Sequence, residues 1–259
     1  MNDLLCTILH HAPLKAGYWT LTLDAPQIAD TAAPGQFVHI RIPTLEPSAL
    51  RRPFSICGAR DGKLHIIYKT VGRGTEKMNA LTTGDTVTVL GPLGNGFPLT
   101  PSGVPLLVAG GYGVAPLCFL AERLPRKGIV FIGGRTADDI LACDKFEHLG
   151  WTVQVATQDG SQGEAGLVTL PLDRELARLG AEGQAAELYA CGPDGMLKAV
   201  GQRAMDNNAR GWLSLDKHIV CGVGACLACV QNIRDPDGST RLARVCRDGP
   251  IFEAREIVW

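Results

Sequence analysis

The chain has 259 residues, which at ~150 residues per domain predicts one large domain or two ordinary ones. Apolar residues make up 46% and charged residues 20%, which excludes a disordered chain. The formal charge is −1, from 25 Lys and Arg against 26 Asp and Glu, so no bulk attraction to nucleic acid or anionic lipid is expected. Glycine is over-represented, with 31 residues, and no repeat accompanies it, so the glycines are expected at tight backbone sites.

The chain shows no leader or membrane-spanning pattern. Residues 1–14 lack the basic start and apolar run of a signal peptide, and the longest uncharged run, Pro101–Ala121, is broken by prolines and glycines. We therefore expect a cytoplasmic protein with no membrane span. Its nine cysteines are then expected to be thiols rather than disulfides. The six histidines show no metal-ligand spacing, and the sequence assigns them no role.

Two regions of different periodicity precede the C-terminal part of the chain. Up to about Pro98, short strand patterns separated by turn signals predict an antiparallel barrel or sandwich. From about 99 to 210, short apolar runs alternate with helical patterns, which predicts a parallel α/β sheet. The strands expected in the first region are Trp19–Leu23, Phe37–Ile42, Leu64–Lys69 and Thr86–Leu90. Those expected in the second are Pro105–Ala109, Ile129–Ile132, Trp151–Ala156 and Leu188–Ala190, with helices at Ala115–Leu124, Ala137–His148, Asp173–Leu179 and Asp194–Asn207.

A cysteine cluster near the C-terminus follows the spacing C-x4-C-x2-C, with a fourth cysteine further along. This is the spacing of plant-type [2Fe–2S] ferredoxins, in which thiolates hold both irons. Gly222 and Gly224 suit a loop folded around inorganic sulfide. A structural zinc is the alternative, but zinc sites usually pair two C-x2-C knuckles and the cluster has one. Four core cysteines are the other alternative. The predicted ligands are Cys221, Cys226, Cys229 and Cys246.

A flavin-binding pattern lies in the first region. The segment Arg52–Ser55 follows a predicted strand, and Gly72–Thr75 opens a helical pattern further along. Arg52 can neutralise a pyrophosphate, and Ser55 can hydrogen-bond a flavin ring. Gly74 and Thr75 at the helix start can offer backbone N–H groups to phosphate. An arginine before a strand is more often simply solvated, so the combination carries the prediction.

With these motifs, the sequence resembles the ferredoxin–NADP reductase superfamily. Within it, the sequence resembles the family of electron-transfer subunits of NAD-dependent (class 1B) dihydroorotate dehydrogenases. The resemblance covers essentially the whole chain, although Tyr112 stands where family members often have an aliphatic residue. The matching segments are Pro34–Phe37, Arg52–Ser55, Gly91–Gly94, Gly110–Pro116, Asp159–Ser161, Cys191–Pro193 and the cysteine cluster.

The resemblance implies a multi-module fold of the α+β and α/β classes. It places an antiparallel β-barrel FAD domain at residues 1–98, a parallel-sheet α/β nicotinamide-binding domain at 99–210, and a small [2Fe–2S] module at 211–259. It also implies that Ser55 and Cys191 take part in catalysis. The FAD contacts that it implies are Arg52, Pro53, Phe54, Ser55, Ile67, Tyr68, Lys69, Gly74 and Thr75.

The nicotinamide site is expected at Val108–Pro116, between a strand and a helix. Glycines there let a pyrophosphate approach the backbone and the helix N-terminus, although such turns also serve packing alone. The resemblance implies that Cys191 lies beside the nicotinamide; a buried structural cysteine is otherwise the commoner case. The expected NAD contacts are Gly110, Gly111, Gly113, Asp159, Cys191, Gly192 and Pro193.

Charge near the end of a predicted strand favours NAD over NADP. The strand Trp151–Ala156 leads into Gln158 and Asp159, where NADP-using relatives commonly place an arginine. An aspartate repels a 2′-phosphate and can accept a hydrogen bond from a ribose hydroxyl. The alternative is that Asp159 merely forms a turn.

The cofactor order follows from the chemistry once the three sites are granted. A cluster carries one electron and a nicotinamide exchanges a hydride, so a flavin must connect them. No substrate domain remains after the three modules are assigned, so electrons must pass to or from another protein. The resemblance implies an FMN-containing dihydroorotate dehydrogenase catalytic subunit as partner, in a heterotetramer of two of each, serving pyrimidine (UMP) biosynthesis. The alternatives are a reductase subunit of a hydrogenase, a sulfide-handling enzyme or a ferredoxin-dependent transhydrogenase, and a non-catalytic redox sensor.

Overall fold

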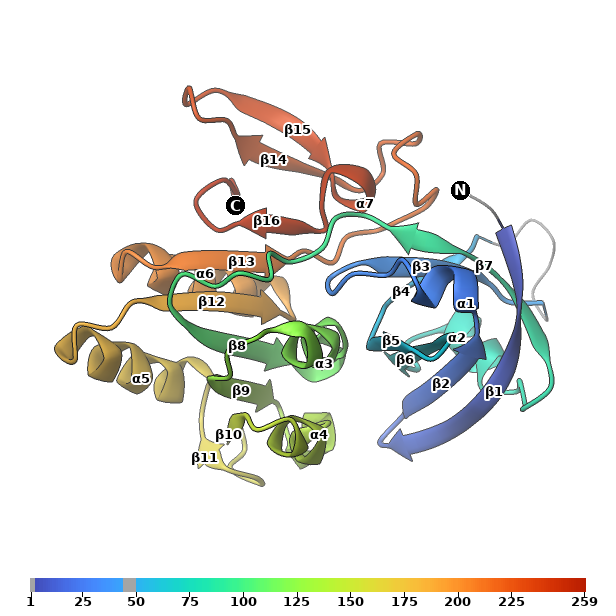
Figure 1. The fold of residues 1–259 in the computed structure, drawn as a ribbon, viewed down its shortest axis with the longest axis horizontal. Helices are drawn as coiled ribbons and strands as arrows, with labels where there is room; N and C mark the ends of the chain where they lie inside the picture. Colours follow the sequence, from blue (N-terminus) through green and yellow to red (C-terminus); the bar gives the residue numbers. More distant parts are fainter. Residues whose placement is uncertain (1–2, 44–49) are drawn as a thin grey trace.

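The computed structural model describes residues 3–43 and 50–259. In these residues the strands form two seven-stranded sheets and one two-stranded hairpin (Figure 1). The first sheet curls into a barrel, and the second, with its helices, stands beside it. The hairpin lies over the edge of the second sheet, and the loop before it reaches toward the barrel. The architecture therefore matches the predicted antiparallel barrel, α/β sheet and C-terminal module.

The barrel sheet is antiparallel, with strand order β4-β3-β7-β1-β2-β6-β5. Its edge strands β4 and β5 are consecutive in sequence, and the residues between them bond to strands on both sides: Ile56 N–H to Gln36 O, and Cys57 N–H to His65 O. Every second residue of β6 is buried, as expected for a strand with one face on a core. The elements are β1 (Asp3–Lys15), β2 (Tyr18–Asp24), α1 (Pro26–Ala29), β3 (Phe37–Arg41), β4 (Arg52–Ser55), β5 (Gly58–Arg60), β6 (Lys63–Lys69), α2 (Arg73–Met78) and β7 (Thr86–Leu93).

The second sheet has the order β11-β10-β9-β8-β12-β13-β16, parallel except for β16. Apart from Glu187 in β12, its central strands are buried and largely apolar, because helices cover both faces. Helices α3 and α4 lie on the face toward the barrel, and α5 and α6 on the other (Figure 1). The elements are β8 (Val104–Gly110), η1 (Gly111–Gly113), α3 (Val114–Arg123), β9 (Ile129–Gly134), η2 (Ala137–Asp139), α4 (Cys143–His148), β10 (Thr152–Thr157), β11 (Glu164–Ala165), α5 (Thr169–Ala181), β12 (Ala186–Cys191), α6 (Asp194–Asp206) and β13 (Arg210–Ser214).

The single helix predicted over Ala137–His148 is wrong. The short helices η2 and α4 occupy this stretch, separated by Ile140 in an extended conformation and by Ala142 with φ of 60°. Ile140 and Leu141 are buried in the core under α3 and α4. The break at Ile140 and Ala142 lets the chain change direction between the two short helices, which one continuous helix would not allow.

The C-terminal module is built on the second sheet rather than set apart from it. Its hairpin is β14 (Val230–Arg234) with β15 (Thr240–Arg244), followed by α7 (Val245–Asp248) and β16 (Ile251–Glu253). β16 pairs with β13 at the edge of the second sheet. The boundary expected near Gly211 therefore falls inside a strand of that sheet.

Two apolar cores join the barrel to the rest of the molecule. Phe37 and Leu93 of the barrel share a core with the cysteine module and the α5–α6 side of the second sheet. Tyr18 and Phe97 share another with α3, α4 and the opposite side of that sheet. The barrel therefore contacts both other modules through buried apolar surface.

Candidate cofactor sites

The two predicted nicotinamide segments meet at the centre of the second sheet. β8 and β12 are neighbouring parallel strands, with Ala109 paired to Cys191, and the chain leaves them toward opposite edges. This is a topological switch point, where open α/β sheets bind ligands beyond the carboxyl ends of their strands. A Cβ on Gly113 would lie 2.2 Å from Cys191 O, and one on Gly192 would lie 3.1 Å from Gly110 Cα. The glycines therefore permit a backbone-to-backbone contact that forms the floor of the crevice.

Polar side chains gather around Cys191 at this crevice. Burial raises the pKa of the Cys191 thiol to about 12, against a hydrogen bond with Ser214 that lowers it, so Cys191 is a neutral thiol at pH 7. Tyr112 O–H donates to Asp216 Oδ2 at 3.2 Å. Burial, with Asp216 nearby, raises the pKa of Tyr112 to about 12. Asp216 was not predicted, because it stands alone in the sequence and reaches the crevice only through the pairing of β13 with β12.

The two predicted flavin segments also meet in space. A Cβ on Gly74 would lie 2.5 Å from Arg52 Nε, so the guanidinium lies directly over this glycine. Thr75 Oγ1 accepts from Val71 N–H at 2.9 Å and donates to Gly72 O at 2.9 Å, which fixes the turn before α2. The first N–H groups of a helix have no partner within it. Arg52 and these N–H groups therefore form a positively polarised surface that fits a pyrophosphate.

The other predicted FAD residues divide between the two faces of their strands. Phe54 and Tyr68 point into the barrel core and pack edge to face at 5.5 Å between ring centroids. The Tyr68 hydroxyl hydrogen-bonds His11 Nε2 at 2.8 Å and donates to Asn79 Oδ1 at 2.9 Å. Pro53, Ser55, Ile67 and Lys69 are half-buried. The Tyr68 side chain is thus occupied within the barrel.

Lys69 links the barrel to the second sheet. Its amine lies 3.0 Å from Asp139 Oδ1 and 4.4 Å from the centroid of the Tyr18 ring. Tyr18 O–H donates to the same Asp139 oxygen at 2.7 Å. A Cβ on Gly111 would lie 3.2 Å from the Tyr18 oxygen, so this group also touches the glycine loop of the nicotinamide crevice.

Asp159 lies in an exposed turn after β10 (Thr152–Thr157). Its Oδ1 accepts from Ser161 N–H at 3.0 Å and from Ser161 Oγ at 2.6 Å, and these hydrogen bonds lower the pKa of Asp159. The turn alternative therefore describes its local structure. The carboxylate is still a negative charge at the end of a parallel strand next to β9, where a 2′-phosphate would be repelled.

The four cysteines of the C-terminal loop form two pairs. Cys221 interacts with Cys226, and Cys229 with Cys246. Burial raises the pKa of the Cys221 thiol, but hydrogen bonds from nearby backbone N–H groups outweigh it and lower that pKa to about 6. Ala225 N–H lies 3.3 Å from Cys221 Sγ.

The two thiol pairs fit a two-iron cluster, in which each iron takes two protein thiolates. Gly222 and Gly224 have φ of 73° and 82°, and a Cβ on Gly224 would lie 2.8 Å from Arg247 Cδ. Glycine at these positions therefore suits a loop that turns its N–H groups toward the sulfurs.

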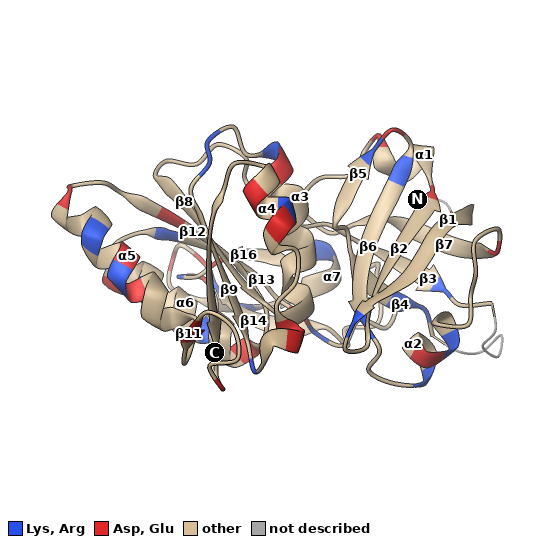
Figure 2. Cartoon of the chain, turned by 90° about the horizontal axis from the view of Figure 1, so that it is seen from below, with Lys and Arg blue, Asp and Glu red and all other residues tan. Residues whose placement is uncertain are grey.

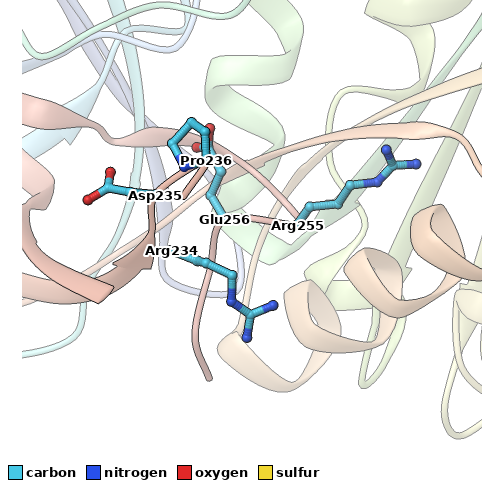
Figure 3. Close-up of a pocket in the computed structure, with 5 residues that line it drawn as sticks. All are labelled: Arg234, Asp235, Pro236, Arg255 and Glu256. Carbon is cyan, nitrogen blue, oxygen red and sulfur yellow. The ribbon is translucent and has the colours of Figure 1, made fainter. Parts of the chain in front are cut away.

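Elsewhere a small pocket of about 170 Å³ lies at the end of β14 away from Cys229 (Figure 3). Arg234 and Arg255 line it, but their guanidinium groups point in different directions. Positive and negative residues are interspersed over all the modules (Figure 2). The described residues contain no helix long and apolar enough to cross a membrane. Neither the pocket nor the charge pattern indicates a further functional site beside the nicotinamide crevice, the surface at Arg52 and Gly74, and the cysteine loop.

Comparison with known proteins places these sites in a family context. A family model of the iron–sulfur cluster binding domain of dihydroorotate dehydrogenase B matches residues 216–258. A model of oxidoreductase NAD-binding domains matches residues 107–202. Both matches fall on the segments that carry the cysteine loop and the nicotinamide crevice.

Full-length relatives carry the same description. The electron transfer subunit of dihydroorotate dehydrogenase B (NAD(+)) from Geobacillus sp. (strain WCH70) is 39% identical over 268 residues, covering 100% of this chain and 99% of that protein. The subunit from Bacillus caldolyticus is 41% identical over 248 residues, covering 93% and 92%.

Solved structures share the fold. The structure of an NADH-dependent reduced ferredoxin–NADP oxidoreductase, described for flavin-based electron bifurcation, superposes with a TM-score of 0.85 at 29% identity, covering 100% of this chain and 91% of that one. A ferredoxin–NADP⁺ reductase from Neisseria gonorrhoeae with bound FAD and NADP superposes with a TM-score of 0.64 at 15% identity, covering 79% and 91%. The second likeness shows the fold alone.

Proposed function

Because this chain belongs to the family of electron transfer subunits of NAD⁺-dependent dihydroorotate dehydrogenase B, we propose that it carries electrons from dihydroorotate oxidation to NAD⁺ in pyrimidine biosynthesis. It would hold FAD in the barrel, NAD in the switch-point crevice and a [2Fe–2S] cluster in the cysteine loop. The electrons would come from an FMN-containing catalytic subunit. We propose two copies of each subunit in the complex.

The position of the barrel between the other two sites carries this proposal. On one side Tyr18 touches Gly111 of the nicotinamide crevice. On the other side His39 touches Gly222 of the cysteine loop. A bound flavin converts the hydride chemistry of nicotinamide into the one-electron chemistry of an iron–sulfur cluster. The contacts support an order of sites that suits this conversion.

The residues of the chain have separate tasks in this proposal. Arg52 and the N–H groups at Gly74 and Thr75 would bind the FAD pyrophosphate, and Ser55 would hydrogen-bond the flavin ring. Cys191, as a neutral buried thiol, would pack beside the nicotinamide without adding charge. The proposed FAD contacts also include Pro53, Phe54, Ile67, Tyr68 and Lys69, the NAD contacts Gly110, Gly111, Gly113, Asp159, Gly192 and Pro193, and the cluster ligands Cys221, Cys226, Cys229 and Cys246.

The test separates the hydride step from the cluster step in the complex with the FMN subunit. Cys226→Ala removes an exposed cluster ligand, so turnover of dihydroorotate with NAD⁺ should be lost. Reduction of bound FAD by NADH should stay near the wild-type rate in stopped-flow absorbance, because that step needs only the barrel and the nicotinamide crevice. Cys143→Ala, at a half-buried cysteine on α4, is the matched control and should retain both. Equal loss of both steps in Cys226→Ala would mean that the loop has only a structural role.

A second candidate function rests on the solved structure with a TM-score of 0.85, which is described as an NADH-dependent reduced ferredoxin–NADP oxidoreductase. A chain of that type would exchange electrons with ferredoxin and a second nicotinamide. Co-purification identifies the partner, and activity with ferredoxin but none with the FMN subunit would favour this candidate. Poor use of NADP⁺ by the complex would favour the first, given Asp159.

A further inference from the structure

His39 lies on the barrel strand that faces the cysteine module. It belongs to β3, whose residues Val38 and Ile40 point into the barrel core. His39 points to the other face, as does Phe37, which packs in the core shared with the cysteine module. The His39 side chain is 0% exposed. It is therefore enclosed between the barrel and the module that follows β13.

Neither ring nitrogen of His39 has a hydrogen bond of good geometry in the described part of the chain, although the backbones of Arg51 and Cys221 lie beside the ring. A buried polar group without a partner costs roughly 1–3 kcal/mol, so such a group calls for an explanation. A neutral imidazole has one N–H donor and one acceptor nitrogen to satisfy.

The cysteine loop presses against this ring. A Cβ on Gly222 would lie 2.8 Å from His39 Nδ1, and Gly222 follows directly after Cys221. With φ of 73°, Gly222 brings the loop backbone closer to the ring than a residue with a side chain would allow. On its other side, His39 pairs across the ladder with Pro53 of the flavin segment. His39 therefore stands next to the strand proposed to bind the flavin, and its ring lies against the cluster loop.

We propose that His39 is a positioning residue of the [2Fe–2S] site, whose ring N–H donates a hydrogen bond to the sulfur shell of the cluster on its Cys221 side. This inference rests on the function proposed above and adds a residue to the electron path between flavin and cluster. Hydrogen bonds to cluster sulfurs are among the factors that set the reduction potential, because they withdraw charge from the reduced form. His39 would thus hold the cluster potential higher than an apolar residue would.

A residue that only fills space would act differently. Leucine occupies a comparable apolar volume, and it would also end the cost of burying two unsatisfied nitrogens. A structural role therefore predicts that His39→Leu retains the cluster with an unchanged potential. The hydrogen bond predicts a retained or less stable cluster with a more negative potential and an unchanged flavin potential.

The primary experiment uses the wild-type complex with the FMN subunit, in which the histidines are labelled with ¹⁵N. Pulsed EPR of the reduced cluster should show a ¹⁵N hyperfine coupling, and His39→Leu should remove it. EPR-monitored redox titration should place the His39→Leu cluster at a more negative potential. His148→Leu, at an exposed histidine on α4, is the control and should change neither.

The variants His39→Asn and His39→Gln show which ring nitrogen is the donor. Asn places an amide near the position of Nδ1, and Gln places one near Nε2. His39→Asn should therefore return the cluster potential to near the wild-type value if Nδ1 is the donor, and His39→Gln should do so if Nε2 is. No histidine coupling in a wild-type complex that holds the cluster and turns over dihydroorotate would overturn the inference alone. Absence of a two-iron cluster from the wild-type protein would overturn the proposed function as well. The ¹⁵N coupling of the wild-type complex therefore tests the hydrogen bond even if every variant loses the cluster.

Discussion

The Arg52 guanidinium lies over Gly74 and hydrogen-bonds the Leu50 carbonyl, so two segments separated along the chain meet at the proposed pyrophosphate site. The residue types and their order were enough to predict this pairing. The sequence could not show that the Thr75 hydroxyl is used inside the turn, because that depends on the local backbone geometry.

Replacing Arg52 by alanine should weaken FAD retention. A charge-assisted hydrogen bond contributes about 1.5–3 kcal/mol. The dissociation constant for FAD should therefore rise roughly ten-fold or more. Flavin fluorescence after gel filtration at several protein concentrations measures the loss. Arg51→Ala is the matched control, because Arg51 pairs with Asp3 at 2.7 Å instead. Wild-type retention in the Arg52 variant would remove Arg52 from the site.

The buried Glu187 in β12 should make the free energy of unfolding sensitive to acid. Burial raises its pKa, but hydrogen bonds from Ser102, Trp212 and Tyr189 outweigh burial and lower it. A folded-state pKa below the unfolded value adds stability above the unfolded pKa of ~4.3, and this stability is lost as the pH falls through the folded pKa.

The variant Glu187→Gln should therefore be less stable at pH 7, by about 1.5–3 kcal/mol, because it turns an amide donor toward groups that donate. Its free energy of unfolding should also fall less steeply than that of the wild type between pH 5 and the acid limit. Urea unfolding at a series of pH values measures both. Glu147→Gln, at an exposed position of α4, should follow the wild-type curve. Parallel pH curves for Glu187→Gln and wild type would contradict the assignment.

At the scale of elements, period and glycine spacing predicted the central strands and the glycine-rich turn between β8 and α3. They failed where tertiary packing decides the backbone. Ala142 takes a left-handed conformation where the chain breaks between η2 and α4, beside the buried Ile140 and Leu141, and no local pattern signals that break. β1 was not predicted at all, because the consecutive His10 and His11 and the later Pro13 interrupt its alternation of apolar and polar residues. Pairing with β2 and β7 on its two sides forms it instead.

The contact between the glycine loop and β12 gives a sharp element-level prediction. In Gly113→Ala the new methyl would meet Cys191 O at 2.2 Å, so the loop must move away from the crevice floor. Overpacking of this kind costs typically 1–3 kcal/mol, and we expect the KM for NADH to rise about ten-fold while the FAD and cluster spectra stay unchanged. Gly180→Ala, within α5 and with no atom within 4 Å of its Cβ, is the control. The control should keep the wild-type KM and gain about 0.5–1 kcal/mol of stability from helix propensity.

At the scale of the whole molecule, the modules are joined by contacts that the sequence motifs do not encode. The motifs predicted which cofactor each module would take. They could not predict that Tyr18 would touch the nicotinamide loop or that His39 would touch the cysteine loop, because each is a single residue on a barrel strand. These contacts arise only when the modules pack together. They place the barrel next to both the nicotinamide loop and the cysteine loop.

Asp139 tests whether this packing matters for electron transfer. It stands on the second sheet and binds two barrel residues, accepting from Tyr18 at 2.7 Å and from Lys69 at 3.0 Å. Asp139→Asn keeps the shape but removes the charge that pairs with Lys69, so the two modules should hold each other less tightly, by about 1.5 kcal/mol. We expect slower reduction of FAD by NADH in stopped-flow absorbance, with unchanged EPR of the cluster. Asp138→Asn, the neighbouring residue in η2, should keep the wild-type rate. Equal rates in both variants would mean that the apolar cores alone align the barrel with the nicotinamide crevice.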